Sequence, residues 1–596
     1  MYNLIKKVSF FDVVFFIFCF AVSRQYSFFI PQFYVSLLFS VIFACFIWVF
    51  YFKGRLRFLP YSSNNSLPFY LMFLPVIIYF FIMGVWPDNS YDTRHFRLFE
   101  HIASLKSFQE DGSFYYLSPN PLAAMVFGIF KIFLGMRGAL IFNVILLVWA
   151  LYECREILYK YIKNEKLLLL VLAVILYGSQ MAFIQLNVYF VDLFSVPLFL
   201  MAFRLVTRGE NDDEYAKLMF LSFLLGLLFA FKYTNLAFIV PLGLVGLFNQ
   251  FKLIKKNPFV LFSGLFFIFP NLPYALYMWL FFKNPVFPYF NAVFKSPYWA
   301  IEDYKIAWSG PKSLIESFLW PVMVTWMPER FSQVIPFYNG RIGISYLMGF
   351  LFLPYALFIK RYDIIRMIFI ILSGLFLWSI STGYGRYMLP LEYGGMVFLI
   401  IAATVAGKNK YFMPYTVAVV ILCAASLAVG LGANFKDKYY NWTWKVLNKT
   451  TLKEFSKNYN QYFNDYDIRK YQTPQTLAKL DKVEAWASVN SEYTTFGYLV
   501  KPAPIFRILH NDYVNPYNFF EKNRYKVFYD IVPEGRIAKF LDDAKKYNIE
   551  ILQTEKIDYF YYSPSQKYKM YLIKFYATDK SIGYSQEEFL KTVVDE

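Results

Sequence analysis

The sequence predicts a polytopic α-helical membrane protein with about 13 transmembrane helices and a small α/β or α+β domain at its C-terminus. The 596 residues are 58% hydrophobic, whereas soluble proteins are about 45–50% apolar. The excess falls in long runs, many of which reach the ~20 residues that a helix needs to cross the ~30 Å hydrocarbon core of a bilayer. After residue 432 these runs stop, and charged residues and Asn become frequent.

The predicted transmembrane helices form three groups, which two long loops at 87–137 and 282–341 separate. One group precedes the first loop, a second lies between the loops, and a third follows the second loop. The predicted helices are residues 8–23, 28–50, 67–86, 138–158, 167–184, 187–206, 215–231, 234–251, 258–281, 342–360, 364–381, 387–405 and 412–432.

Basic residues concentrate in short loops between the apolar runs, and the formal net charge is +18. This is the positive-inside pattern of membrane proteins and not a basic face for nucleic acid, so we expect no nucleic-acid partner. An odd number of helices then places the N-terminus in the cytoplasm and the C-terminal domain outside. The basic residues assigned to the cytoplasmic side are Lys6, Lys7, Lys53, Arg55, Arg57, Arg155, Lys160, Lys163, Lys166, Arg204, Arg208, Lys252, Lys255, Lys256, Lys360, Arg361, Arg366, Lys408 and Lys410.

The two long loops are predicted to lie on the outer side of the membrane. The first contains PLAAMVFGIFKIFLG (121–135), which is short for a transmembrane helix and would break the alternation of the loops if it crossed. We therefore expect a helix at the membrane interface there. Residues 91–108 show an amphipathic spacing and predict a second such helix. The loop 282–341 is rich in aromatic residues, which favour the headgroup layer and also stack on sugar rings.

The C-terminal residues 433–596 are predicted to form a domain separate from the transmembrane domain 1–432. VEAWASV (483–489) and MYLIKFYA (570–577) have the composition of strands, as does YFYYS at 559–563. GRIAKFLDDAKKYNI (535–549) has the apolar spacing of an amphipathic helix.

Acidic residues near the outer ends of the predicted helices are candidate functional residues, because charge at membrane depth is costly. Asp88 and Asp92 form a close pair at the start of the first outer loop. Asp192 lies early in the sixth predicted helix, and Glu392 lies near the start of the twelfth.

Three basic residues, Lys232, Arg341 and Arg386, come from separate points of the chain and lie at the same predicted depth. Cations that converge at one depth indicate a bound anion, such as a lipid phosphate. The structural alternative is that Lys232 and Arg386 reach to lipid headgroups.

Several segments resemble the GT-C superfamily of membrane glycosyltransferases, which includes protein O-mannosyltransferases and the bacterial aminoarabinose transferase. In the first outer loop these are WPDNSYDTRHF (86–96) and SPNPLAAMVFGIFKIFLGMRGALIFNV (118–144). Later in the chain they are NPVFPYFNAVFKSP (284–297) and GYGRYMLPLEY (383–393). The resemblance covers most of 67–405, by the order of features more than by identity. Two extra predicted helices before the acidic loop depart from the simplest layout of the group.

The resemblance implies transfer of a sugar from a polyprenyl-phosphate donor to an acceptor on the outer face of a bacterial cytoplasmic (inner) membrane. The acceptor would be a cell-envelope glycan, a lipid or a protein. Asp88 would act as the general base that takes the proton of the acceptor hydroxyl. Asp92 would support Asp88 or orient the acceptor. The structural alternative for Asp88 is a helix N-cap.

The remaining candidates would bind the donor and the substrate. Lys232, Arg386 and Arg341 would hold the donor phosphate and stabilise its developing charge. The expected substrate-binding residues are Tyr91, His95, Asp192 and Glu392.

We expect no tightly held metal and no other cofactor, because the sequence contains no His, Asp and Glu cluster with metal-ligand spacing. In relatives that use a divalent cation, Asp88 and Asp92 would contribute to its site. The sequence also lacks a glycine-rich phosphate loop, which argues against direct use of a nucleotide sugar.

Other functions fit parts of the sequence. A transporter or flippase of lipid-linked glycans would carry broken helices and charges near mid-bilayer. A polymerase or ligase of such glycans would centre its site on a large outer loop, and 282–341 suits that role. A non-enzymatic scaffold would use the C-terminal domain as a binding module.

Overall fold

The computed structural model describes residues 8–61, 67–83, 120–208, 214–287, 289–297, 301, 310–325, 327, 330, 340–421, 424–425, 469, 472–489, 500–501, 503, 505–507, 524–560, 567–579 and 584–594. They divide into two compact units, which are described separately. The first draws on residues 1–88, 125–272 and 306–464, and the second on residues 89–124, 273–305 and 465–596.

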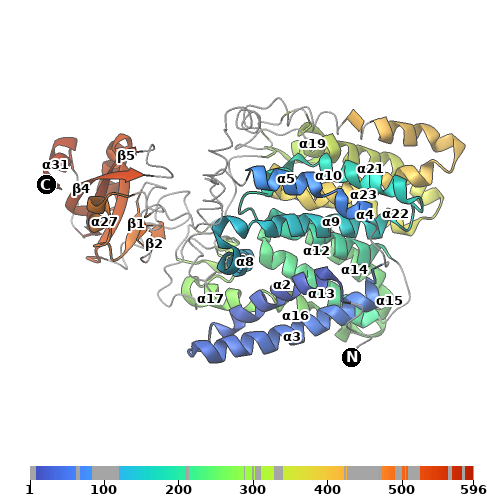
Figure 1. The fold of residues 1–596 in the computed structure, drawn as a ribbon, viewed down its shortest axis with the longest axis horizontal. Coiled ribbons are helices and arrows are strands. Elements are labelled where there is room, and N and C mark those ends of the chain that lie inside the picture. Colours follow the sequence, from blue (N-terminus) through green and yellow to red (C-terminus); the bar gives the residue numbers. More distant parts are fainter. Residues whose placement is uncertain are drawn as a thin grey trace. The chain divides into compact units, whose positions relative to one another are not determined.

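The first unit is helical, and its long helices run alongside one another (Figure 1), whereas the short helices within residues 273–305 belong to the second unit. The helices that precede the C-terminal sheet in the chain are α2 Phe10–Ser27, α3 Phe33–Phe58, α4 Leu67–Leu71, α5 Leu74–Met83, α8 Leu122–Gly138, α9 Ile141–Leu158, α10 Glu165–Tyr177, α11 Gln180–Gln185, α12 Asp192–Thr207, α13 Glu214–Phe231, η1 Tyr233–Asn235, α14 Leu236–Asn249, α15 Phe251–Lys256, η2 Pro258–Gly264, α16 Leu265–Ile268, α17 Leu272–Phe282, α18 Asn291–Phe294, α19 Leu314–Met323, α21 Gly340–Phe358, α22 Tyr362–Ser381, η3 Gly385–Met388, α23 Leu389–Ala406 and η4 Lys410–Phe412.

Five of the described helices are long and apolar enough to cross a membrane: α2, α3, α21, α22 and the continuous η3–α23 segment. A sixth is added if the broken pair Pro258–Ile268 and Leu272–Leu280 counts as one crossing. The shorter apolar helices, of 10–17 residues, are Leu67–Phe81, Leu122–Gly135, Tyr215–Phe231, Tyr233–Asn249 and Leu314–Met323. These helices support a multi-pass membrane protein, while the number of about thirteen crossings stays a prediction.

Contacts between α9 and α12 define two ends of the helical unit. Near the start of both helices, the Asn143 side chain of α9 donates a hydrogen bond to the carbonyl of Val188 at 2.9 Å, shortly before α12 begins at Asp192. Near their C-terminal ends, Arg204 of α12 lies 3.2 Å from the carboxylate of Glu153 in α9. The two helices therefore run in the same direction, and we refer to the Asp192 end and the Arg204 end.

The Arg204 end contains a buried charge cluster. Arg204 lies between the carboxylates of Glu153, at 3.2 Å, and Glu156, at 3.5 Å. Arg55, in the last turn of α3, donates from Nε to Asp12 in the first turn of α2 at 2.8 Å. All five side chains are buried. Buried charges are tolerated when they are paired and hydrogen-bonded, so this cluster fixes the helix ends relative to one another.

The sequence analysis ended the second predicted helix at residue 50 and so placed Arg55 in a loop, which was wrong, whereas Arg155 and Arg204 lie inside the predicted helices 138–158 and 187–206. The structure places each of them in the last turn of a helix, where all three are buried. The reason is that acidic residues inside the apolar runs supply partners, for example Glu156, which lies 3.3 Å from Arg155.

The C-terminal part of the second unit contains a six-stranded mixed sheet in the order β2-β1-β3-β5-β4-β6 among the described residues (Figure 1). β1 is parallel to β2 and β3, β5 is antiparallel to β3 and β4, and β6 is parallel to β4. The elements are α27 Pro474–Leu480, β1 Trp486–Ser488, β2 Ile505–Arg507, β3 Phe528–Pro533, η6 Glu534–Arg536, α30 Ile537–Lys546, β4 Ile549–Phe560, β5 Lys567–Ala577, α31 Gln586–Lys591 and β6 Val593–Val594.

Helices pack on both faces of this sheet. Phe528 and Val532 of β3 share one apolar cluster with Phe540 of α30, and Ile531 shares another with Leu480 of α27. Successive strand side chains point to opposite faces, so β3 contributes to both clusters. A small sheet domain is confirmed: β1 and α30 lie within the predicted segments 483–489 and 535–549, and β5 contains the predicted segment 570–577 and begins three residues earlier.

Candidate functional site

The candidate site begins with Asp192, the first residue of α12. The Gln185 side chain accepts a hydrogen bond from the Leu193 backbone N–H at 3.1 Å, which satisfies one of the free donors at the start of the helix. Acidic side chains are common in the first turn of a helix, where they face the positive end of the helix dipole. The Asp192 side chain is almost completely buried.

Lys232 and Arg386 share the Asp192 carboxylate. The Lys232 ammonium forms an ion pair with Oδ1, and the Arg386 Nε lies 3.7 Å from Oδ2. Lys232 follows the end of α13, and Arg386 belongs to η3. Their side chains are 12% and 16% exposed, compared with 2% for Asp192. Together these three groups carry one net positive charge, and the two cations are the more accessible members.

Aromatic rings pack against both cations. The Lys232 ammonium lies 3.5 Å from the ring centroid of Tyr387. The Arg386 guanidinium lies 4.3 Å from the centroid of Phe190 and 5.4 Å from that of Tyr387. Cation–π contacts of this kind hold a cation in place without neutralising it.

Asn235 ties the segment after Lys232 to α12. Its side-chain amide donates to the Ser195 hydroxyl and to the Leu228 carbonyl, both at 2.7 Å. Asn235 is buried, and it follows Lys232 by one turn of η1. The site is therefore assembled from α12, the α13–α14 connection and the α22–α23 connection, which are far apart in the sequence.

Arg341 and Glu392 form another pair at the Asp192 end. The Arg341 guanidinium donates to the carbonyls of Val174, at 2.6 Å, and Ile175, at 3.0 Å, near the C-terminus of α10. It lies 3.5 Å from the Glu392 carboxylate. A Cβ atom at Gly178 would lie 1.4 Å from Arg341 Nη2, so only glycine admits the guanidinium there. These contacts give Arg341 a capping role, and its binding of phosphate stays a prediction.

Four predicted site residues lie outside the described residues, and their roles stay predictions. They are Asp88, Tyr91, Asp92 and His95. In the part of the chain that the structure describes, no group of three or more His, Cys, Asp and Glu side chains is arranged to hold a metal ion.

The sequence analysis missed three residues that shape the site: Phe190, Asn235 and Tyr387. Phe190 and Tyr387 each lie within two residues of a predicted site residue, so proximity in the sequence was an available signal. Asn235 offered no signal of that kind, because its importance depends on its contact with α12.

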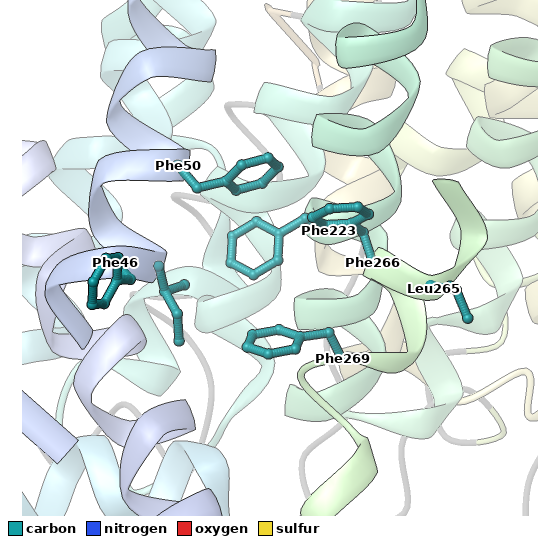
Figure 2. A pocket seen from close by; sticks show the side chains of 7 residues that line it. Phe46, Phe50, Phe223, Leu265, Phe266 and Phe269 are labelled. Carbon is teal, nitrogen blue, oxygen red and sulfur yellow. The ribbon is translucent and has the colours of Figure 1, made fainter. Parts of the chain in front are cut away.

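A separate apolar pocket of about 330 Å³ lies among α3, α13 and α16 (Figure 2). Its lining residues are Phe46, Ile47, Phe50, Phe223, Leu265, Phe266 and Phe269. Binding sites for polar ligands use a few placed polar groups to fix orientation, and this lining supplies none. The pocket can accept hydrocarbon but cannot orient a sugar or a phosphate.

No protein-family model matches the sequence, and no curated protein matches it. Two solved structures resemble this chain, both of ArnT from Cupriavidus metallidurans. The apo structure has a TM-score of 0.42 at 12% identity and covers 85% of this chain and 97% of ArnT. The structure bound to undecaprenyl phosphate has a TM-score of 0.45 at 12% identity and covers 87% of this chain and 100% of ArnT. At these values neither similarity assigns a function to this chain.

Proposed function

We propose that this chain is a GT-C-type membrane glycosyltransferase that takes its sugar from a polyprenyl-phosphate donor on the outer face of the membrane. The observation that carries the proposal is the convergence of Lys232 and Arg386 on one carboxylate at one end of the helical unit. Lys232 and Arg386 together with Asp192 carry one net positive charge. Such a site suits the phosphate of a lipid, which would lie at the depth of these helix ends.

In the proposed reaction, an acceptor hydroxyl oxygen forms a bond to the sugar carbon. The bond from that carbon to the phosphate oxygen breaks, and its electron pair stays with the departing polyprenyl phosphate. Lys232 and Arg386 would stabilise this developing charge. Asp88 would receive the hydroxyl proton, and Asp92 would orient the acceptor or support Asp88. The acceptor is proposed to be a glycan, lipid or protein of the cell envelope.

The test separates donor binding from transfer. We expect Arg386→Ala, in purified chain in lipid nanodiscs, to weaken binding of undecaprenyl phosphate at least about tenfold, because a charge-assisted hydrogen bond is worth ~1.5–3 kcal/mol. Arg366→Ala is the matched control, since Arg366 is also partly buried but lies in the second turn of α22, away from η3. Asp88→Asn should keep this binding and abolish transfer, read as loss of the modified surface glycan by mass spectrometry.

Two results would contradict the proposal. Undecaprenyl phosphate that binds Arg386→Ala as well as wild type would exclude the phosphate site. Normal transfer by Asp88→Asn would exclude Asp88 as the general base and leave the phosphate site standing.

A further inference from the structure

The turn that precedes Arg386 is held by two buried tryptophans. The Trp320 indole N–H, from α19, donates to the carbonyl of Gly383 at 3.0 Å. The Trp378 indole N–H, from α22, donates to the carbonyl of Tyr384 at 2.9 Å. Consecutive carbonyls are thus fixed by helices on different parts of the chain. Arg386 follows two residues after the second carbonyl.

The same turn is in backbone contact with the segment that leads into α19. Gly383 adopts φ +58°, and a Cβ atom there would lie 2.7 Å from the Cα of Gly310 and 2.7 Å from Pro311. Gly310 adopts φ +97°, and its Cβ would lie 2.7 Å from the carbonyl of Thr382. Both conformations favour glycine, and both close approaches require it. A side chain at either glycine would therefore force the two backbone segments apart.

Arg330 packs against Trp320 and contacts the same segment. Its guanidinium lies 5.0 Å from the Trp320 ring centroid and forms an ion pair with Glu316 of α19 at 2.6 Å. It also donates to the Gly310 carbonyl at 3.3 Å. These contacts of Arg330 with α19 and with Gly310 therefore help to hold the Trp320 indole in the position from which it donates to Gly383.

We propose that Trp320 is a positioning residue, which sets the place of the Arg386 guanidinium by holding the Gly383 carbonyl. The proposal rests on the proposed function, in which Arg386 binds the donor phosphate. Arg386 lies three residues after Gly383, so a shift of this carbonyl moves the start of η3 and the side chain it carries. Small misplacements of a binding group have large effects on a reaction. Because coupling between two sites is reciprocal, donor binding should also protect α19 from hydrogen exchange.

The first measurement tests the mechanical link and does not depend on any donor. In Trp320→Phe the N–H donor is lost and a smaller aromatic ring takes the place of the indole. We expect faster hydrogen exchange at the backbone amides of 383–388 than in wild type. Trp48→Phe is the matched control, because the Trp48 indole N–H also donates to a backbone carbonyl, that of Asp12 at 2.6 Å, in the α2–α3 pair. Unchanged exchange at 383–388 in Trp320→Phe would overturn the proposal.

The second measurement tests the consequence for phosphate. We expect Trp320→Phe to weaken undecaprenyl phosphate binding about fivefold, the effect of one lost hydrogen bond of ~1 kcal/mol. In an Arg386→Ala background the same substitution should have no further effect, because the two residues act through one contact. Equal weakening in both backgrounds would overturn the positioning role.

A further variant keeps the proposal testable if Trp320→Phe fails to fold. Arg330→Gln removes the Arg330 guanidinium at a partly exposed position, and it should raise exchange at 383–388 in the same direction but less. The outcomes also separate the two proposals. Faster exchange in the variants, together with no binding of undecaprenyl phosphate by wild type, would refute the proposed function and keep the mechanical link.

Discussion

At the scale of single residues, the candidate site depends on the position of Asp192 between two cations. A phosphate that enters must compete with the Asp192 carboxylate for Lys232 and Arg386. Asp192 was predicted to bind substrate, and this stays a prediction, while its observed contacts are the ion pairs with the two cations.

Replacement of this carboxylate should therefore strengthen anion binding. In Asp192→Asn the three groups carry two net positive charges, and we expect about fivefold tighter binding of undecaprenyl phosphate, with a steeper dependence on salt. Glu392→Gln is the matched control, because it removes an acid at the same end whose observed partner is Arg341. Binding by Asp192→Asn that is weaker than wild type would show that the carboxylate mainly orients the cations.

The sequence predicts which residues lie at the site's depth, but not which of them meet. Lys232, Arg341 and Arg386 were placed together because hydropathy gives each residue a depth along its helix. Depth says nothing about the position of a helix around the bundle, and packing alone decides that. Lys232 and Arg386 share Asp192, whereas Arg341 turns to the end of α10 beside Gly178.

At the scale of the elements, the ends of the helices carry information that hydropathy does not show. The run ALYECREIL ends α9 with Glu153, Arg155 and Glu156, three charges inside a predicted helix whose partners hydropathy does not reveal. They stay inside the helix because Arg204 of the neighbouring α12 pairs with both acids. The partner is distant in sequence, so no local pattern reveals it.

The charge cluster makes a prediction about stability. Glu153→Gln leaves Arg204 with one carboxylate in a buried position, and we expect a loss of about 3 kcal/mol in unfolding free energy. The double variant Glu153→Gln with Arg204→Met should lose less than the sum of the single variants, because no unpaired charge remains. Glu165→Gln in the exposed first turn of α10 is the control. Denaturant titration in detergent measures all four, and additive losses would contradict the pairing.

At the scale of the whole molecule, the sequence predicts a helical membrane part and a small C-terminal domain with strands, but not the order of the strands in the sheet. β1, β5 and α30 have regular apolar patterns and coincide with or overlap predicted segments, whereas β3 was missed. Its sequence FYDIVP contains Asp530, which is buried and accepts a hydrogen bond from the Val489 backbone N–H at 2.8 Å. A buried acid inside a strand resembles a loop residue until its partner from the neighbouring strand is known.

The orientation of the helical unit decides whether the candidate site can meet an outer-face donor. Asp192, Lys232 and Arg386 lie at one end, and the positive-inside rule predicts that the other end, the Arg204 end, faces the cytoplasm. α3 ends at the Arg204 end, because Arg204 donates to the carbonyl of Leu59, the residue just after α3. α2 begins at the same end, because Asp12 in its first turn accepts a hydrogen bond from Arg55 in the last turn of α3. The exposed Gln32 between α2 and α3 is therefore at the Asp192 end.

Cysteine labelling in intact cells tests this orientation. We expect a membrane-impermeant maleimide to label Gln32→Cys, because it lies on the same side as the proposed phosphate site. Lys408→Cys follows the end of α23, which starts beside Arg386, so it should react only after the cells are permeabilised. Wild type gives the background from the native cysteines. Labelling of Lys408→Cys in intact cells would reverse the orientation and place Lys232 and Arg386 on the cytoplasmic face, where an outer-face donor cannot reach them.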